Sequence, residues 1–151
     1  MKNTRYRLLT LLVTVVLAIP LTAGQCGQDI ETNPDLPGSD GFRGNAEEVA
    51  LGTSVIGVVD TKAGDTNDWK YFIVPSVGVV TITVTFDKHD AYCEMVLTDE
   101  RGQTLSTFQD EKRQLLDKIT IKADPGKYYV RIFAKEGDSD YTLTVTYDPL
   151  Q

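Results

Sequence analysis

The chain has 151 residues, of which 41% are hydrophobic and 25% charged, and its formal net charge is −7. This length suits one domain, and the composition is that of a globular protein rather than a disordered one. Without the first 25 residues, 12 basic and 22 acidic residues remain, which gives a net charge of −10. Such a surface repels phosphate backbones and excludes nucleic acid as a partner, whereas it attracts cations such as calcium. The alternative is that the acidity only keeps the protein soluble.

Residues 1–25 have the layout of a secretory signal peptide. Lys2, Arg5 and Arg7 form a basic start, and a largely apolar run follows over residues 8–19. Small residues come after Pro20, in the order typical of a segment that is removed on export. The apolar run is shorter than the roughly 20 residues of a membrane span, so a retained anchor is the lesser alternative.

The sequence Leu-Thr-Ala-Gly-Gln-Cys at residues 21–26 resembles a bacterial lipobox, in which the cysteine is lipidated and becomes the new N-terminus. Gln25 stands where that motif usually has a small residue. We expect Cys26 to carry a lipid anchor, which would place the protein at the outer membrane or in the periplasm. Cleavage after Ala23 or Gly24 would instead release an extracellular product.

Residues 26–44 are polar and rich in proline and glycine, which predicts a flexible linker or tether. From residue 45 to 151 the pattern is that of one β domain, because apolar and polar residues alternate in runs separated by turn signals. We predict an all-β, antiparallel, jelly-roll-like β-sandwich of about eight strands. The strands are expected at 54–60, 69–74, 78–86, 92–98, 103–108, 116–122, 127–134 and 140–147.

Two details of this pattern are testable in a structure. The alternation around Cys93 predicts that Cys93, Met95 and Leu97 face the core, so that Cys93 is a buried thiol rather than a partner of Cys26 in a disulfide. A short helix is possible only at 46–51 or at 111–116.

Three motifs, in this order, resemble the bacterial pre-peptidase C-terminal domain family. The motifs lie at residues 64–72 (Gly-Asp-Thr-Asn-Asp-Trp-Lys-Tyr-Phe), at 99–105 (Asp-Glu-Arg-Gly-Gln-Thr-Leu), and at 125–132 with 140–145, where Gly-Lys-Tyr-Tyr-Val and Tyr-Thr-Leu-Thr-Val close the domain. The first motif has one residue more than the family pattern between Gly64 and Trp69. The family usually follows a secreted peptidase, and residues 1–44 of this sequence contain none. The resemblance therefore implies a β-sandwich with an accessory or binding role.

The sequence carries no pattern that indicates an enzyme. His89 is the only histidine and lies in a charged, solvent-facing turn, so neither a Ser-His-Asp triad nor a zinc site of several histidines is supported. Glycine-rich phosphate loops are absent from the sequence. The carboxylate pairs Glu47-Glu48 and Asp110-Glu111 fit a solvated surface.

Calcium is the one metal that the sequence suggests. It prefers six to eight oxygen ligands, and acidic or amide oxygens gather in and near one loop. The candidate ligands are Glu47, Glu48, Asp60, Asp65, Asn67 and Asp68. The alternative is a turn in which Asp68 accepts backbone hydrogen bonds.

Aromatic and basic residues suggest a partner-binding surface on one strand. Tyr129, Arg131 and Phe133 alternate with Tyr128, Val130 and Ile132, so they lie on the opposite face of that strand. If that face is open, it has the composition of a binding hot spot; if it is covered, these residues belong to the core. Trp69 is expected to be a core anchor.

We therefore expect a non-catalytic, exported, lipid-anchored binding or accessory module with a protein or polysaccharide partner in the cell envelope. The alternative is a free secreted adhesin or matrix-binding module that calcium assists.

Overall fold

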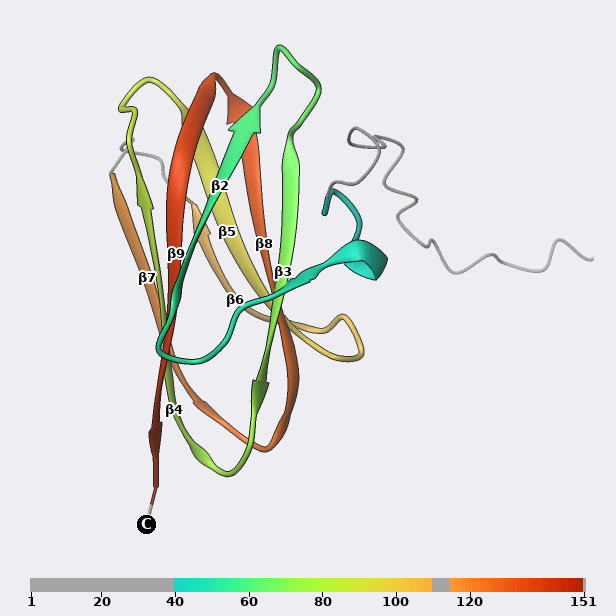
Figure 1. Ribbon diagram of the computed structural model, residues 1–151, viewed down its shortest axis with the longest axis vertical. Helices are drawn as coiled ribbons and strands as arrows, with labels where there is room; N and C mark the ends of the chain where they lie inside the picture. The colour runs from blue at the N-terminus through green and yellow to red at the C-terminus, as the bar shows by residue number, and fades with distance from the viewer. Residues whose placement is uncertain (1–39, 110–114, 151) are drawn as a thin grey trace, which may run out of the picture. The chain divides into compact units, whose positions relative to one another are not determined.

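The computed structural model describes residues 40–109 and 115–150. These residues form two β-sheets that face each other as a sandwich (Figure 1), which confirms the predicted fold class. The predicted signal peptide, Cys26 and most of the predicted linker lie outside the described residues. A short 3-10 helix, η1 (Arg43–Asn45), precedes strands β1 (Glu47–Glu48), β2 (Ser54–Asp60), β3 (Asn67–Val74), β4 (Gly78–Phe86), β5 (Tyr92–Asp99), β6 (Thr104–Gln109), β7 (Leu116–Ala123), β8 (Gly126–Glu136) and β9 (Asp138–Pro149).

The two sheets differ in size and in the way their strands are connected. The larger sheet has the strand order β1-β3-β8-β5-β6, and the smaller one has the order β2-β9-β4-β7. Neighbouring strands are antiparallel except for β1, which pairs with β3 in parallel. Most chain connections therefore cross from one sheet to the other, which brings residues distant in sequence together on each face.

The core forms where the inward faces of the two sheets meet. In β4 the apolar residues Val80, Ile82 and Val84 are fully buried, whereas the threonines between them are on the outer face. The same alternation places Leu143 and Val145 of β9 in the core. β-branched side chains fit this pleated, half-buried geometry, so the local preference of the sequence and the packing of the sandwich agree.

The predicted inward face of β5 is also confirmed. Cys93, Met95 and Leu97 are each at most 1% exposed and lie in the core cluster. Cys93 is therefore a buried thiol, as expected from its place in the strand pattern.

The start of the domain differs from the prediction. A helix at 46–51 is wrong, because Glu47 and Glu48 form strand β1 opposite Lys70 and Tyr71 on the edge of β3. Unpaired edge groups of a sheet offer such a segment more hydrogen bonds than one helical turn would. The helix proposed at 111–116 falls mainly outside the described residues, and Leu116 begins β7.

The folded region extends into the range predicted to be a linker. Asp40 is buried, its backbone oxygen accepts a hydrogen bond of 2.7 Å from the backbone of Trp69, and its carboxylate pairs with Lys70. Arg43 begins η1 beside β3. Residues 40–44 thus pack on the larger sheet.

Within the described ranges, no helix is both long and apolar enough to cross a membrane.

Candidate functional site

The outer face of the larger sheet carries a strip of aromatic and basic side chains. β8 sends Tyr128, Val130 and Ile132 into the core and Tyr129, Arg131 and Phe133 outward, and the outward three are half-buried rather than covered by a further sheet. These three residues are thus neither fully open nor part of the core, and their role in partner binding stays a prediction. Together with neighbours from β3 and η1 they make the cation–aromatic face, defined here as Arg43, Trp69, Tyr71, Lys127, Tyr129, Arg131 and Phe133.

The pairing of β3 with β8 brings the aromatic residues of the two strands together. Tyr71 lies opposite Tyr129, and their ring centroids are 6.1 Å apart with the planes inclined at 50°. Trp69 lies opposite Arg131, whose guanidinium carbon is 5.7 Å from the centre of the indole. Aromatic pairs at this spacing attract each other beyond the effect of burial, so the register fixes the rings as a rigid platform.

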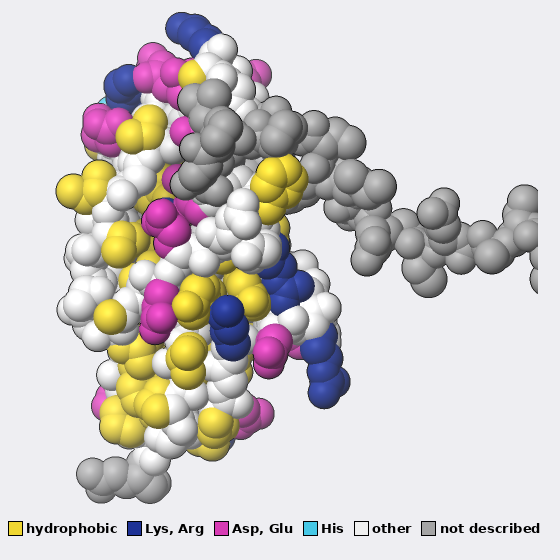
Figure 2. Space-filling model, turned by 45° about the vertical axis from the view of Figure 1, so that its right-hand side comes forward, with side chains coloured by type: hydrophobic (Ala, Val, Ile, Leu, Met, Phe, Trp, Pro, Cys, Tyr) yellow, Lys and Arg dark blue, Asp and Glu magenta, His cyan; other side chains and the backbone are white. Residues whose placement is uncertain are grey.

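Two cations from distant parts of the chain lie against this aromatic platform. The Lys127 ammonium lies 3.6 Å from the centre of the Tyr71 ring and 5.0 Å from that of Tyr129. The Arg43 guanidinium lies 4.2 Å from the centre of the Tyr129 ring. Both distances are within the range of cation–π attraction. Figure 2 shows basic and hydrophobic side chains next to each other on this side of the molecule.

Arg43 is held in place by the turn between β5 and β6. Its Nη2 donates hydrogen bonds to the backbone oxygens of Asp99, at 3.1 Å, and of Glu100. These acceptors are carbonyl groups, which leave the positive charge uncompensated. Among the described residues, neither Arg43 nor Lys127 forms an ion pair with a carboxylate. In a strongly acidic protein, the two side chains therefore concentrate positive charge around Tyr129.

Arg131 is the fixed centre of the strip. Its Nε donates a hydrogen bond of 2.7 Å to Oδ1 of Asn67, and its Nη2 donates to the same oxygen. The guanidinium also lies 4.8 Å from the centre of the Phe133 ring. Because Asn67 is neutral, these bonds orient the guanidinium without cancelling its charge.

Trp69 is buried, at 8% exposed, as expected of a core anchor. It lies outside the main core cluster, because alternation along β3 places Phe72 and Val74 inward and Trp69 on the outer face. Arg131 lies against the ring, and the Trp69 backbone is bonded to Asp40. The indole thus belongs to the cation–aromatic face.

Sequence reasoning missed Arg43, Tyr71 and Lys127 as members of this face. Lys127 was detectable, since it shares the alternation of Tyr129 and Arg131. Tyr71 and Arg43 required the strand register and the packing of η1, which link residues far apart in the chain.

The six candidate calcium ligands do not converge on one point. Adjacent strand residues point to opposite faces, and Asn67 accordingly reaches Arg131 on the outer face while Asp68 reaches Tyr141 in the interior. Asp60 Oδ1 accepts hydrogen bonds from the backbone of residues 62 and 63 at 2.8 and 3.2 Å, as in an Asx turn.

The other candidates are also engaged within the chain. The backbone oxygen of Asp65 accepts a hydrogen bond from Asp60, Glu47 pairs with Lys70 at 2.7 Å, and Glu48 accepts a hydrogen bond of 3.0 Å from the Tyr71 hydroxyl. In the part of the chain that the structure describes, no three Asp, Glu, His or Cys residues are grouped so that they could hold a metal ion. Calcium binding stays a prediction.

A buried polar network lies on the inner side of β3. Burial raises the pKa of Asp68 to about 7, and neither its hydrogen bond from Tyr141 nor the nearby Lys70 offsets this effect. Burial and the Asp68 carboxylate together raise the pKa of Tyr141. Burial alone would lower the pKa of Lys70, but its hydrogen bonds to Asp40 and Glu47 outweigh this effect and raise the pKa. The network therefore fastens residues 40–48 to β3.

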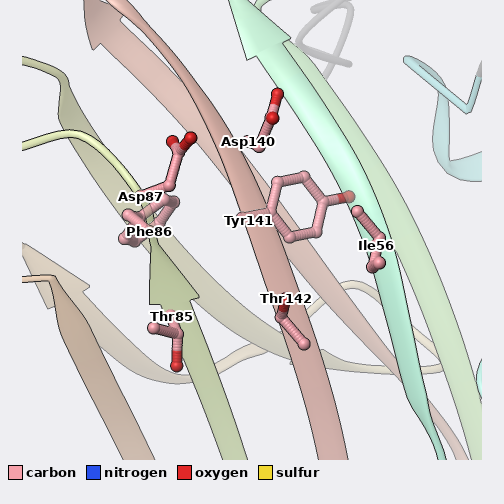
Figure 3. Close-up of a pocket in the computed structure, with 7 residues that line it drawn as sticks. All are labelled: Ile56, Thr85, Phe86, Asp87, Asp140, Tyr141 and Thr142. Atoms are coloured by element: carbon pink, nitrogen blue, oxygen red, sulfur yellow. The ribbon is translucent and has the colours of Figure 1, made fainter.

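One shallow pocket lies on the outer face of the smaller sheet (Figure 3). It has a volume of about 170 Å³ and lies over Tyr141 and Thr142 of β9, with Ile56 of β2 on one side and Phe86 of β4 on the other. The remaining lining residues are Thr85, Asp87 and Asp140. His89 is exposed in the turn after β4 and does not line it.

Solved structures with a similar fold are known for the described domain. The pre-peptidase C-terminal domain of a collagenase from Bacillus anthracis is 26% identical, with a TM-score of 0.59, and the match covers 67% of this chain and 94% of that one. A mitogen derived from Yersinia pseudotuberculosis is 13% identical over 66% of this chain and 87% of the other, with a TM-score of 0.45. CorA, a surface-associated copper-binding protein of Methylomicrobium album BG8, is 9% identical over 68% and 98%, with a TM-score of 0.48.

No family model matches the chain, and no curated protein matches it. The collagenase domain has the fold that the three sequence motifs predict, and it aligns with two thirds of this chain. In fold and in sequence motifs, the described domain is therefore similar to a pre-peptidase C-terminal domain.

Proposed function

We propose that the protein is an exported, non-catalytic binding module whose recognition surface is the cation–aromatic face. The observation that carries the proposal is the position of Lys127 and Arg43 around Tyr129, because both cations lie on a half-buried aromatic platform and lack a carboxylate partner in the described part of the chain. Aromatic and arginine side chains dominate binding hot spots.

The chemistry of the face favours a partner with acidic groups. From Lys127 to Phe133 the strip runs along β8 for roughly 20 Å, at about 3.3 Å per residue. An extended polymer fits a strip of this shape better than a compact ligand does. We propose an acidic polysaccharide of the cell envelope as the partner, with its acid groups at the cations and its apolar sugar faces near the rings. An acidic protein segment is the alternative.

Binding of the purified protein to polygalacturonate, compared with neutral dextran, tests the proposal. Replacing Lys127 and Arg43 by Ala together should weaken binding to polygalacturonate at least about tenfold, since hydrogen bonds to charged groups contribute about 1.5–3 kcal/mol each. The matched control replaces Lys118 and Lys122 by Ala, which removes the same charge from the exposed side of β7 in the other sheet.

The outcomes separate three cases. Weakening by the first variant but not by the control supports the face. Equal weakening by both variants would show that only the net charge of the protein matters, and this result would overturn the proposal. Binding to polyglutamate but not to polygalacturonate would assign the face to an acidic protein instead.

Export and anchoring rest on residues 1–26, and the fold is compatible with both. We propose that the chain is exported and that Cys26 is lipidated, which would hold the module at the outer membrane or in the periplasm. Mass spectrometry of the N-terminus of the protein from its native host tests this. A diacylated Cys26 supports anchoring, whereas an unmodified N-terminus at Gly24 or Gln25 would assign it to free secretion.

A further inference from the structure

The pocket on the smaller sheet has two carboxylates at one end (Figure 3). The backbone N–H of Asp87 donates a hydrogen bond of 3.1 Å to the oxygen of Asp140, which holds the two residues side by side at the end of the β4–β9 ladder. Both residues are exposed and point away from the core, since the neighbouring Phe86 and Tyr141 point into it. Like charges opposite each other on two strands destabilise a sheet, so this pair weakens the fold.

Neither carboxylate is neutralised by an ion pair within the ranges that the structure describes. Oδ1 of Asp87 accepts a hydrogen bond of 2.7 Å from the hydroxyl of Ser139, which carries no charge. Lys88 is adjacent in sequence, but its ammonium pairs with Asp138 and acts on the two carboxylates only from a distance. The pair of Asp87 and Asp140 therefore keeps negative charge that a bound cation can compensate.

The same pocket has an apolar side. Ile56 lines it and is 79% exposed, and Val58, further along β2, is 47% exposed and lies opposite Asp140. Thr85 and Thr142 lie at the end away from the carboxylates. The volume of about 170 Å³ is smaller than the roughly 300–1,000 Å³ of pockets that enclose a small molecule. The pocket therefore has the size for a single side chain, one that combines an apolar part with a cation.

We propose that this pocket is a second binding site, which takes one lysine side chain from a basic segment of a partner protein. The ammonium lies between Asp87 and Asp140, and the alkyl stem lies along Ile56, as lysine stems do on apolar surfaces. Val58 lies outside the pocket, so it is available to the residues that flank the lysine, which favours a protein segment over a free amine.

The charge of the chain supports a basic partner. The net charge of −7 attracts a cationic segment from a distance and orients it before contact. Because the pocket lies on the smaller sheet and the cation–aromatic face on the larger one, the two sites differ in sign and in position. The lysine site therefore stands or falls independently of the function proposed above.

Titration of the isotope-labelled protein with two peptides, followed by NMR, tests the site. One short peptide with blocked ends has a single lysine between leucines, and the other has norleucine in place of the lysine. The lysine peptide should shift the signals of Ile56 and Thr142, and the norleucine peptide should bind at least about tenfold more weakly, because it cannot form charge-assisted hydrogen bonds. Unchanged signals at these residues in millimolar lysine peptide would overturn the proposal.

Asp140→Asn tests the carboxylate pair, and Asp148→Asn is the matched control, because it removes the same charge from an exposed position further along β9. Asp140→Asn should weaken binding of the lysine peptide at least about tenfold, whereas the control should leave it nearly unchanged. Equal weakening by both variants would reveal an effect of net charge alone and would refute the site.

Two further results separate the site from a structural role and from a site for free amines. Asp140→Asn removes the repulsion from Asp87, so its thermal midpoint should not fall below that of the wild type. A lower midpoint with unchanged peptide binding would assign Asp140 to the structure of the sheet alone. Butylammonium supplies the cation and the stem without a peptide, and it should bind more weakly than the lysine peptide. Equal affinities would show a site for free amines and exclude the protein partner.

Discussion

The hydroxyl of Tyr141 in β9 donates a hydrogen bond of 2.5 Å to Oδ2 of Asp68 in β3. Both residues are buried, and the bond joins the two sheets of the sandwich. Burial outweighs this bond and raises the pKa of Asp68 from 3.8 to about 7. Asp40 and Asp65 raise it further, whereas Lys70 lowers it.

We predict that the stability of the protein falls as the pH rises from about 4 to about 7. The folded state keeps Asp68 protonated in this interval and the unfolded state does not, so unfolding releases a proton and becomes easier at higher pH. Asp68→Asn keeps an oxygen acceptor for Tyr141 but cannot ionise. Urea unfolding should therefore show that this variant lacks the decrease and is more stable than the wild type at pH near 8. Parallel pH profiles for both proteins would contradict the prediction.

A second prediction concerns the ion pair that attaches residues 40–48 to β3. The Lys70 side chain is 5% exposed and pairs with Asp40, whose side chain is 10% exposed. Lys70→Met leaves this buried carboxylate without its partner, which typically costs about 3–5 kcal/mol. Adding Asp40→Asn should recover part of the loss, because the uncompensated charge is removed. Denaturant unfolding of the single and double variants measures both effects, and a double variant less stable than Lys70→Met would contradict this account.

The sequence allows the strands to be predicted well where local pattern and packing agree. In β4 and β9, threonines alternate with apolar residues, and the turns between strands carry glycine, proline or aspartate, so the period and the boundaries are both visible. β3 is harder, because its two faces both include large apolar residues. The inward position of Lys70 and the outward position of Trp69 follow from Asp40 and Arg131, which approach from distant parts of the chain.

The candidate site could be predicted only in part for the same reason. Alternation within β8 is a local property, and it places Tyr129, Arg131 and Phe133 together. The contacts of Tyr71 and Arg43 with Tyr129 depend on pairing across many residues, and single-chain periodicity does not specify which strands become neighbours. The calcium candidates show the opposite problem. Asn67 and Asp68 are adjacent in the sequence and were therefore predicted to share a site, but the strand directs their side chains to opposite faces.

A third prediction concerns the core. Leu97 is fully buried between the sheets, so Leu97→Ala should lower the free energy of unfolding by about 2–5 kcal/mol through lost burial and a residual cavity. Leu105→Ala, at a position 41% exposed in the neighbouring strand, is the control and should cost far less. Chemical denaturation distinguishes the two, and similar losses would refute the assignment of Leu97 to the core.

A fourth prediction concerns calcium. If an ion binds the folded state through Asp60 and Asp65 in the loop after β2, mass action stabilises the fold by about 2.7 kcal/mol at a hundredfold excess over the dissociation constant. The thermal midpoint should then rise with added calcium and return on chelation, and Asp65→Asn should reduce the shift. A thermal midpoint that does not change with millimolar calcium would show that Asp60 and Asp65 bind no calcium and serve only in the turn contacts described above.

The last prediction concerns Gly57, which faces Tyr141 across the β2–β9 pair. A Cβ at this position would lie 2.2 Å from the Tyr141 hydroxyl oxygen and 2.3 Å from the ring carbon that bears it. Tyr141 is 1% exposed and bonded to Asp68, so its ring has little freedom to move. Gly57→Ala should therefore destabilise the protein by about 1–3 kcal/mol through overpacking.

Gly44→Ala is the matched control, because its Cβ would meet nothing within 4 Å, and a change within about 0.5 kcal/mol is expected there. A double-mutant cycle then assigns the strain to its source. Gly57→Ala should cost clearly less in a Tyr141→Ala background, because the ring that it collides with is gone. Equal costs in the two backgrounds would place the requirement for glycine in the backbone of β2 rather than in its contact with Tyr141.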